Sequence, residues 1–121
     1  MRDIVNIQER PVGSVIVLDV AGRLVAGDGD GKLKDKVNSL LLQGQHELLL
    51  NLAEVSYIDS NGLGELVASH ATVRRHGGHI KLVNLTKRVQ DLLAICRLLT
   101  VFDAFDSEAD ALRSFEATAR A

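Results

Sequence analysis

Apolar residues recur along the chain in two patterns, and the two patterns alternate from one end to the other. Alternating apolar and polar residues, or a short continuous apolar run, predict a β-strand, whereas apolar residues three and four positions apart predict an amphipathic helix. The strand pattern occurs in five segments, at residues 4–9, 14–21, 47–52, 79–85 and 100–105. The run at 47–52 is almost continuously apolar, as expected of a strand that is covered on both faces.

Helical patterns lie between and after these strands. Their inward positions are Leu33, Val37, Leu40 and Leu41 in the first helix, Leu63, Leu66, Val67, His70 and Ala71 in the second, and Val89, Leu92, Leu93 and Cys96 in the third. Gly44 and the pair Gly77–Gly78 are typical signals for the end of a helix. Thr86 is suited to cap the third helix, and Asp106 or Ser107 is suited to cap a fourth.

The order of these elements predicts the fold. The first two strands are joined by a short turn at residues 10–13, so they should pair as an antiparallel hairpin. Strands and helices then alternate, which favours parallel strands joined by crossover helices. We therefore expect one α/β domain over residues 1–121, with a mixed, mostly parallel sheet of four to five strands and about four helices.

Composition and charge exclude several classes of protein. The chain has 46% hydrophobic and 25% charged residues, which is typical of a soluble globular protein. The formal net charge of −2 and the few aromatic residues, three Phe and one Tyr, argue against nucleic-acid binding. Apolar runs such as residues 15–18 are far shorter than the roughly 20 residues that span a bilayer, and the N-terminus does not resemble a signal peptide. We expect a cytoplasmic protein without direct membrane insertion.

Residues 58–64 depart from helical preference at the start of the second helix. Gly62 and Gly64 fall in or beside its first turn, where each glycine costs up to about 1 kcal/mol relative to alanine. Such departures concentrate at functional sites, and glycine lets another backbone or a large ligand come close. Ser60 stands at the same helix start with its hydroxyl expected to point outward, where backbone N–H groups and the helix dipole favour an anion.

Phosphorylation of Ser60 is the switch that this arrangement suggests. It would add about −1.5 to −2 charges beside Asp59, and a partner surface that fits a neutral hydroxyl would then be repelled. A simpler interpretation is that Ser60 or Asn61 only caps the helix. A capping box needs Glu or Gln three residues after the cap, whereas Leu63 and Gly64 stand there, so the capping interpretation is incomplete.

The same segment resembles the phosphorylation-site motif of the STAS family, in which Asp-Ser is followed by a small or polar residue and then Gly-Leu. Other landmarks resemble that family too: Gly-Arg-Leu at 22–24, Leu-Asn-Leu at 50–52, and the glycine pair at 77–78. The resemblance extends over nearly the whole chain. Two features depart from the family pattern. Asn61 stands where many relatives have Ser, Thr or Ala. The loop at 26–32 replaces a more usual acidic segment before the first helix.

The resemblance implies a binding module of the anti-sigma factor antagonist type. In that group the serine after the aspartate, Ser60 here, is phosphorylated by the anti-sigma factor, which is itself a serine kinase, and a metal-dependent serine phosphatase removes the phosphate. The unphosphorylated form binds the anti-sigma factor and thereby frees the sigma factor for transcription. By similarity, Asp59 would orient or flank the serine. The implied docking surface consists of Asp59, Ser60, Asn61, Gly62, Leu63 and Gly64.

The glycine-rich loop at Gly27–Gly31 fits neither a phosphate-binding loop nor a calcium loop. Ala26 stands where the phosphate-binding motif needs glycine, and Leu33 stands where it needs Ser or Thr. Lys32 occupies a position that a calcium loop reserves for a ligand. We interpret the segment as a solvated loop whose role, if it has one, is partner specificity.

Metal-binding, thiol and enzymatic roles are not expected, and neither is a cofactor. The chain has four histidines, His46, His70, His76 and His79. They could bind a metal only if distant elements came together, and His70 is expected at the edge of the core. Cys96, the only cysteine, shares a helical stripe with apolar residues and is expected to be buried. Ile58 stands where a nucleophile elbow needs glycine, so Ser60 is interpreted as a phosphate acceptor and not as a catalytic nucleophile.

Two rival hypotheses stay open at this point. Within the same family, the chain could be an accessory STAS subunit of a membrane ABC transport system for lipids, which would bind without phosphorylation. In another class, it could be a small hydrolase or nucleotide-binding enzyme that uses Ser60 or the loop at Gly27–Gly31.

Overall fold

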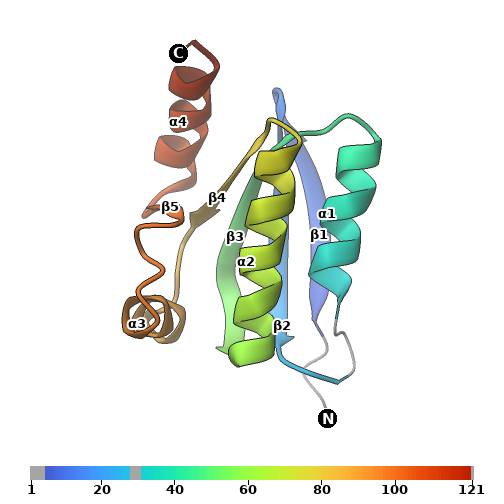
Figure 1. Cartoon of the computed structure of the whole chain (residues 1–121). Coiled ribbons are helices and arrows are strands. Elements are labelled where there is room, and N and C mark those ends of the chain that lie inside the picture. The colour runs from blue at the N-terminus through green and yellow to red at the C-terminus, as the bar shows by residue number, and fades with distance from the viewer. Residues whose placement is uncertain (1–4, 28–30, 121) are drawn as a thin grey trace.

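Helices cover both faces of one sheet in the computed structural model, which describes residues 5–27 and 31–120 (Figure 1). The strands in these ranges are β1 (Asn6–Val12), β2 (Val15–Leu24), β3 (Glu47–Ile58), β4 (His79–Val83) and β5 (Asp103–Phe105). The helices are α1 (Lys32–Leu42), α2 (Ser60–Arg75), α3 (Lys87–Ile95) and α4 (Glu108–Arg120). The predicted α/β fold with a mixed, mostly parallel sheet is confirmed.

The strands follow one another across the sheet in chain order, with β1 and β2 antiparallel and the later neighbours parallel. The hairpin turn lies at Gly13 and Ser14 instead of residues 10–13, because β1 continues through Pro11 to Val12. Since β1 is an edge strand, the missing N–H of Pro11 is tolerated there. Gly13 turns the chain with a φ of 61°, in the left-handed region that glycine adopts without strain.

β3 is longer than the segment predicted at 47–52. Its second half alternates exposed residues with the buried Val55 and Ile58, and it continues to pair with the end of β2, where Gly22 lies opposite Val55 and Leu24 opposite Ile58. A register irregularity in β2 accompanies this extension. The extra length matters for the site, because it carries the chain directly to the residue before α2.

The core is aliphatic and lies in two layers, one on each face of the sheet. The larger layer contains the buried side chains of α1, α2 and α3, including Leu33, Val37, Leu40, Leu66, Val89 and Leu93, packed against β2, β3 and β4. The smaller layer joins α4, through Ala111 and Phe115, to the opposite face at Val15, Val17, Leu49 and Val83. The helices in the described ranges are too short or too polar to cross a lipid bilayer.

Cys96 is exposed, so the prediction that it is buried is wrong. α3 ends at Ile95, and Cys96 is the C-cap residue that follows the last helical position. The helical spacing that places Val89 and Leu93 inward therefore no longer applies at Cys96.

The predicted N-caps of the last two helices are confirmed. The Thr86 hydroxyl accepts from the backbone N–H of Val89 at 3.3 Å, and the Ser107 hydroxyl accepts from that of Asp110 at 3.1 Å. Of the two candidates for α4, Ser107 is therefore the capping residue.

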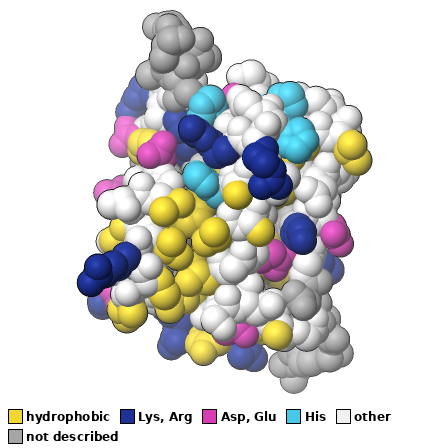
Figure 2. Space-filling view, in the orientation of Figure 1, with side chains coloured by type: hydrophobic (Ala, Val, Ile, Leu, Met, Phe, Trp, Pro, Cys, Tyr) yellow, Lys and Arg dark blue, Asp and Glu magenta, His cyan; other side chains and the backbone are white. Residues whose placement is uncertain are grey.

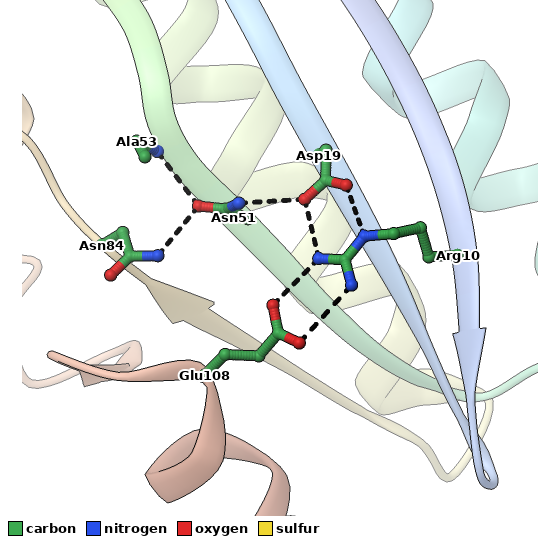
Figure 3. Close-up of polar contacts among 6 residues, drawn as sticks. All are labelled: Arg10, Asp19, Asn51, Ala53, Asn84 and Glu108. Carbon is green, nitrogen blue, oxygen red and sulfur yellow. Dashed lines mark hydrogen bonds and ion pairs between the residues drawn. The ribbon is translucent and has the colours of Figure 1, made fainter.

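Polar side chains cross the sheet beneath the start of α4 (Figure 3). Arg10 of β1 donates to both carboxylate oxygens of Asp19, and its Nη2 lies 2.8 Å from Oε1 of Glu108 in the first turn of α4. Asn51 donates to Asp19 at 2.9 Å, and Asn84 donates to Asn51 at 3.1 Å. The hydrogen bonds from Arg10 lower the pKa of Asp19 below its ordinary value. Because partly exposed ion pairs each contribute about 0–1 kcal/mol, these contacts mainly orient α4, and its apolar side chains hold it in place.

Ser69 of α2 is 1% exposed, and its hydroxyl has no hydrogen-bond partner among the residues that the structure describes. Because an unpaired buried hydroxyl costs about 1–3 kcal/mol, we expect Ser69→Ala to raise the free energy of unfolding by about 1 kcal/mol in urea titrations. Ser114→Ala is the matched control, since the Ser114 hydroxyl donates to the Ala111 carbonyl at 2.6 Å and accepts from Lys81 at 3.0 Å. The control should lose stability. An equal loss in Ser69→Ala would contradict the prediction.

Candidate functional site

The candidate site lies where β3 ends and α2 begins. Asp59 is the N-cap of α2, with extended backbone angles, and its Oδ1 accepts from the N–H of Gly62 at 2.9 Å. Its Oδ2 accepts from the N–H of Ala26 at 3.3 Å, and its own N–H donates to the Leu24 carbonyl at 3.2 Å. Asp59 therefore joins the helix start to the end of β2. The hydrogen bond from Gly62, with a further one from Ala26, lowers the pKa of Asp59 below its ordinary value.

Ser60 is the first residue of α2, and the alternative that Ser60 or Asn61 caps the helix is wrong. A capping side chain accepts from an N–H two or three residues later, and the Asp59 carboxylate already accepts from the N–H of Gly62. The Ser60 side chain is exposed, and its hydroxyl forms no hydrogen bond with any residue in the described ranges. The expected outward position of this hydroxyl is confirmed.

The two glycines of the segment have different roles. A β-carbon on Gly62 would lie 2.0 Å from the carbonyl oxygen of Leu24, so the backbone that comes close to this glycine is β2 of the same chain. A β-carbon on Gly64 would meet no described atom within 4 Å. Gly62 and Leu63 are buried and position the helix start, whereas Ser60, Asn61 and Gly64 form its exposed side.

A shallow hollow of about 470 Å³ lies between the starts of α1 and α2, and Ser60 is on its wall. The other lining residues are Gly31, Lys34, Asn61, Gly64, Glu65 and Ala68. Glu65 Oε2 accepts from the backbone N–H of Lys34 at 3.0 Å. The N-cap residue of α1 is Gly31, which has no side chain to accept from this N–H. Glu65 accepts in its place, and the contact joins the two helices. Sequence reasoning did not identify Lys34 or Glu65, because no local signal links positions on different helices.

The groups around the Ser60 hydroxyl are engaged elsewhere. The hollow is lined by no histidine in the part of the chain that the structure describes, and the Asp59 carboxylate is already engaged with two backbone amides. A general base must lie within hydrogen-bond reach of the proton it takes. The Glu65 carboxylate, which also lines the hollow, accepts from the backbone N–H of Lys34, and no described residue is hydrogen-bonded to the Ser60 hydroxyl.

The histidines His70 and His79 lie away from this site. His70 lies at the edge of the core, as predicted, with its ring edge-on to Phe102 at a centroid distance of 5.2 Å, and burial lowers its pKa. His79 lies 3.0 Å from Glu47 at the far end of the sheet. Among the described residues, no group of three or more His, Cys, Asp or Glu side chains could hold a metal ion. The centre of the Gly27–Gly31 loop, residues 28–30, lies outside the described ranges.

A family model for the STAS domain matches residues 6–111, which include every described strand and the start of α4. The chain belongs to the STAS domain family. The anti-sigma-B factor antagonist of Bacillus subtilis (strain 168) is 32% identical over 99 residues, covering 82% of this chain and 89% of the relative.

Solved structures of other proteins share the fold. An anti-sigma factor antagonist from Mycobacterium paratuberculosis superposes with a TM-score of 0.82 at 18% identity, covering 94% of this chain and 96% of that one. The Bacillus cell fate determinant SpoIIAA in its phosphorylated form gives a TM-score of 0.70 at 18% identity, covering 91% of this chain and 99% of that one. At these identities the likeness shows the fold alone.

The two glycines of the site offer a matched pair of substitutions. Gly62→Ala should lower the free energy of unfolding by about 1–3 kcal/mol, because its new methyl group collides with the Leu24 backbone. Gly64→Ala should raise it by up to about 1 kcal/mol, because alanine has the higher helix propensity and the surface is open. Urea titrations of both variants test this. Equal effects would show that the Gly62–Leu24 contact does not constrain the helix start.

The Asp59 cap predicts a pH dependence of stability. Because the pKa of Asp59 is lower in the folded chain, its carboxylate stabilises the fold above the unfolded value near about 3.9 and loses this effect as the pH falls through the folded pKa. The gap in free energy of unfolding between the wild type and Asp59→Asn should therefore be largest near neutral pH and shrink below about pH 4. Ser60→Ala, which retains the cap, should follow the wild-type pH curve. A gap between wild type and Asp59→Asn that stays constant into acid would refute the assignment.

Proposed function

We propose that this STAS protein is an anti-sigma factor antagonist that binds an anti-sigma factor serine kinase and is released when Ser60 is phosphorylated. The observation that carries the proposal is the exposed Ser60 hydroxyl at the start of α2, directly after the capping Asp59. The relative from Bacillus subtilis, which carries the name of an anti-sigma factor antagonist, supports it. In this proposal the chain is a cytoplasmic binding partner and the phosphate acceptor, and the catalytic machinery belongs to the kinase.

The unphosphorylated surface suits close docking. Ser60, Asn61 and Gly64 present two small groups and one amide at the exposed side of α2, and Gly64 leaves open space above the helix. A partner can therefore place its own backbone or a flat side chain against the helix start. Ser60, Asn61 and Gly64 carry no charge of their own, and the carboxylates beside them, Asp59 and Glu65, already accept from backbone amides.

Phosphoryl transfer requires the kinase to supply ATP, magnesium and a base. Ser60 Oγ forms a new bond to the γ-phosphorus as the bond between that phosphorus and ADP breaks. The hydroxyl proton passes to the base of the kinase. Ser60 can be reached for this step because its side chain is exposed and forms no hydrogen bond within the described ranges.

The phosphate opposes docking by its charge. It adds about −1.5 to −2 charges next to the Asp59 carboxylate, and burying such a group without a matching cation costs several kcal/mol. A micromolar complex is worth only about 8 kcal/mol, so a penalty of this size releases the partner. Within the chain, the N-terminus of α2 tolerates an anion, so the fold can stay intact in both states. A serine phosphatase would then restore the binding-competent form.

Substitutions at Ser60 test the proposal. In intact-mass measurements after incubation with the anti-sigma factor and ATP, the wild type should gain one phosphate and Ser60→Ala should gain none. In calorimetric titrations, Ser60→Asp should bind at least about tenfold more weakly than the wild type, a change of about 1.4 kcal/mol.

Ser39→Ala is the control, because Ser39 is an exposed serine on α1 and should leave both phosphorylation and binding unchanged. Phosphorylation that persists in Ser60→Ala, or wild-type affinity in Ser60→Asp, would refute the switch. Binding to a lipid transport complex without any phosphorylation would favour the accessory-subunit role instead.

A further inference from the structure

Two arginine side chains lie over the ring of Tyr57, two residues before the capping Asp59. The guanidinium of Arg23, on β2, is 5.3 Å from the ring centroid, and that of Arg88, in the first turn of α3, is 4.9 Å from it. Both distances are within the range of cation–π contacts. Arg23 is the register partner of Tyr57, so the stack joins the ends of β2 and β3 to the start of α3.

A groove of about 530 Å³ lies beside this stack, between the end of β3 and α3. Its lining residues are Tyr57, Ile58, Lys87, Arg88, Asp91, Leu92 and Ile95. We call it the Tyr57 groove. Ile95, in the last turn of α3, is 78% exposed, although it is a large apolar side chain. Figure 2 shows apolar side chains gathered on the surface between α2 and α3, with Lys or Arg side chains at their border.

The charges of the Tyr57 groove are unbalanced. The one carboxylate in its lining, Asp91, already pairs with Lys87 at 3.0 Å. No carboxylate forms an ion pair with Arg23 or Arg88 in the part of the chain that the structure describes. This local excess of positive charge stands out in a chain whose formal net charge is −2. Exposed apolar surface bordered by unpaired charge is typical of a protein-binding site.

The groove lies beside the strand ends that lead to α2, although it shares no lining residue with the hollow at Ser60. Leu24 follows Arg23 directly and is the residue against which Gly62 packs. Asp59 follows Tyr57 and Ile58 in sequence and holds the helix start through its carboxylate. The stack over Tyr57 is therefore linked to the start of α2 through Leu24 and Asp59.

We propose that the Tyr57 groove receives an acidic segment of the anti-sigma factor, with Arg23 and Arg88 binding its carboxylates and Ile95 packing against an apolar side chain within it. This inference rests on the proposed function and adds a second contact to it. Charge complementarity favours this occupant. A nucleic acid fits less well, because the only tyrosine ring is already covered by two guanidinium groups and the chain as a whole is acidic.

With this second contact, two separate parts of the interface would have different roles in recognition. Ser60 would report phosphorylation at one end of the interface, while the Tyr57 groove would select the partner by charge and by an apolar anchor at the other. The groove retains its charge when Ser60 is phosphorylated, so it can still steer a kinase or a phosphatase towards the site.

Calorimetric titration of the unphosphorylated chain with the purified anti-sigma factor of the same organism tests this, at low and at high salt. The double variant Arg23→Gln/Arg88→Gln should bind about tenfold more weakly at low salt, about 1.4 kcal/mol, and should lose most of the salt dependence of the wild type. Ile95→Ala should bind about tenfold more weakly at both salt concentrations. Thermal unfolding of each variant confirms that it is folded.

Matched controls come from the far end of the molecule. Leu42→Ala removes an apolar side chain that is 91% exposed at the end of α1, and Arg74→Gln/Arg75→Gln removes two exposed charges at the end of α2. Both should bind within about twofold of the wild type.

The outcomes separate this inference from the proposed function. If the groove variants bind like the wild type while Ser60→Asp does not bind, the groove inference is overturned and the phosphorylation switch stands. If the wild type does not bind the anti-sigma factor, both are overturned. If Ile95→Ala abolishes self-association in sedimentation experiments but leaves the anti-sigma factor complex intact, the occupant is a second copy of the chain and the inference is again overturned.

Discussion

The backbone of Gly62 lies so close to the carbonyl group of Leu24 that no side chain fits between them, and the rest of the site depends on this contact. It sets the first turn of α2 against the end of β2. From that position Asp59 can accept from the amides of both segments. Once Asp59 occupies the cap, Ser60 becomes the first helical residue and its hydroxyl faces solvent.

At the junction of β3 and α2, the contacts that hold the helix start do not involve the side chain that the proposed switch would modify. Gly62 and Leu63 face the sheet, and Asp59 binds the backbone on both sides. None of these contacts involves the Ser60 hydroxyl, so a change in its charge leaves the framework around it in place. The bridge between Glu65 and the amide of Lys34 extends this framework to α1. A partner that docks here would thus meet one surface made of two helices, with the Ser60 hydroxyl on it.

Sequence patterns predicted the fold well because the core is periodic. Leu33, Val37 and Leu40 are buried at the spacing that made their helix recognisable, and the apolar runs became the central strands. The exposed Ser60 was also predictable from its place at a helix start. The identity of the cap was not, since Ser, Asn and Asp all suit that position and tertiary contacts with Ala26 and Leu24 decided between them.

Other features of the site depend on elements distant in sequence. The close approach of Gly62 to β2, the bridge from Glu65 to α1 and the arginines over Tyr57 all join separate segments. The burial of Cys96 was predicted wrongly because a stripe of apolar residues does not reveal where its helix ends. Local patterns thus indicated where the site lies, and only the folded chain shows what surrounds it.

The position of Tyr57 has a spectroscopic consequence. The chain contains one tyrosine and no tryptophan, so its near-ultraviolet emission arises almost entirely from this ring. Two guanidinium groups lie over the ring, and the residue that caps α2 follows two positions later. The protein therefore carries a native optical probe close in sequence to the start of α2, and rearrangement of the neighbouring arginines can be followed without attaching a dye.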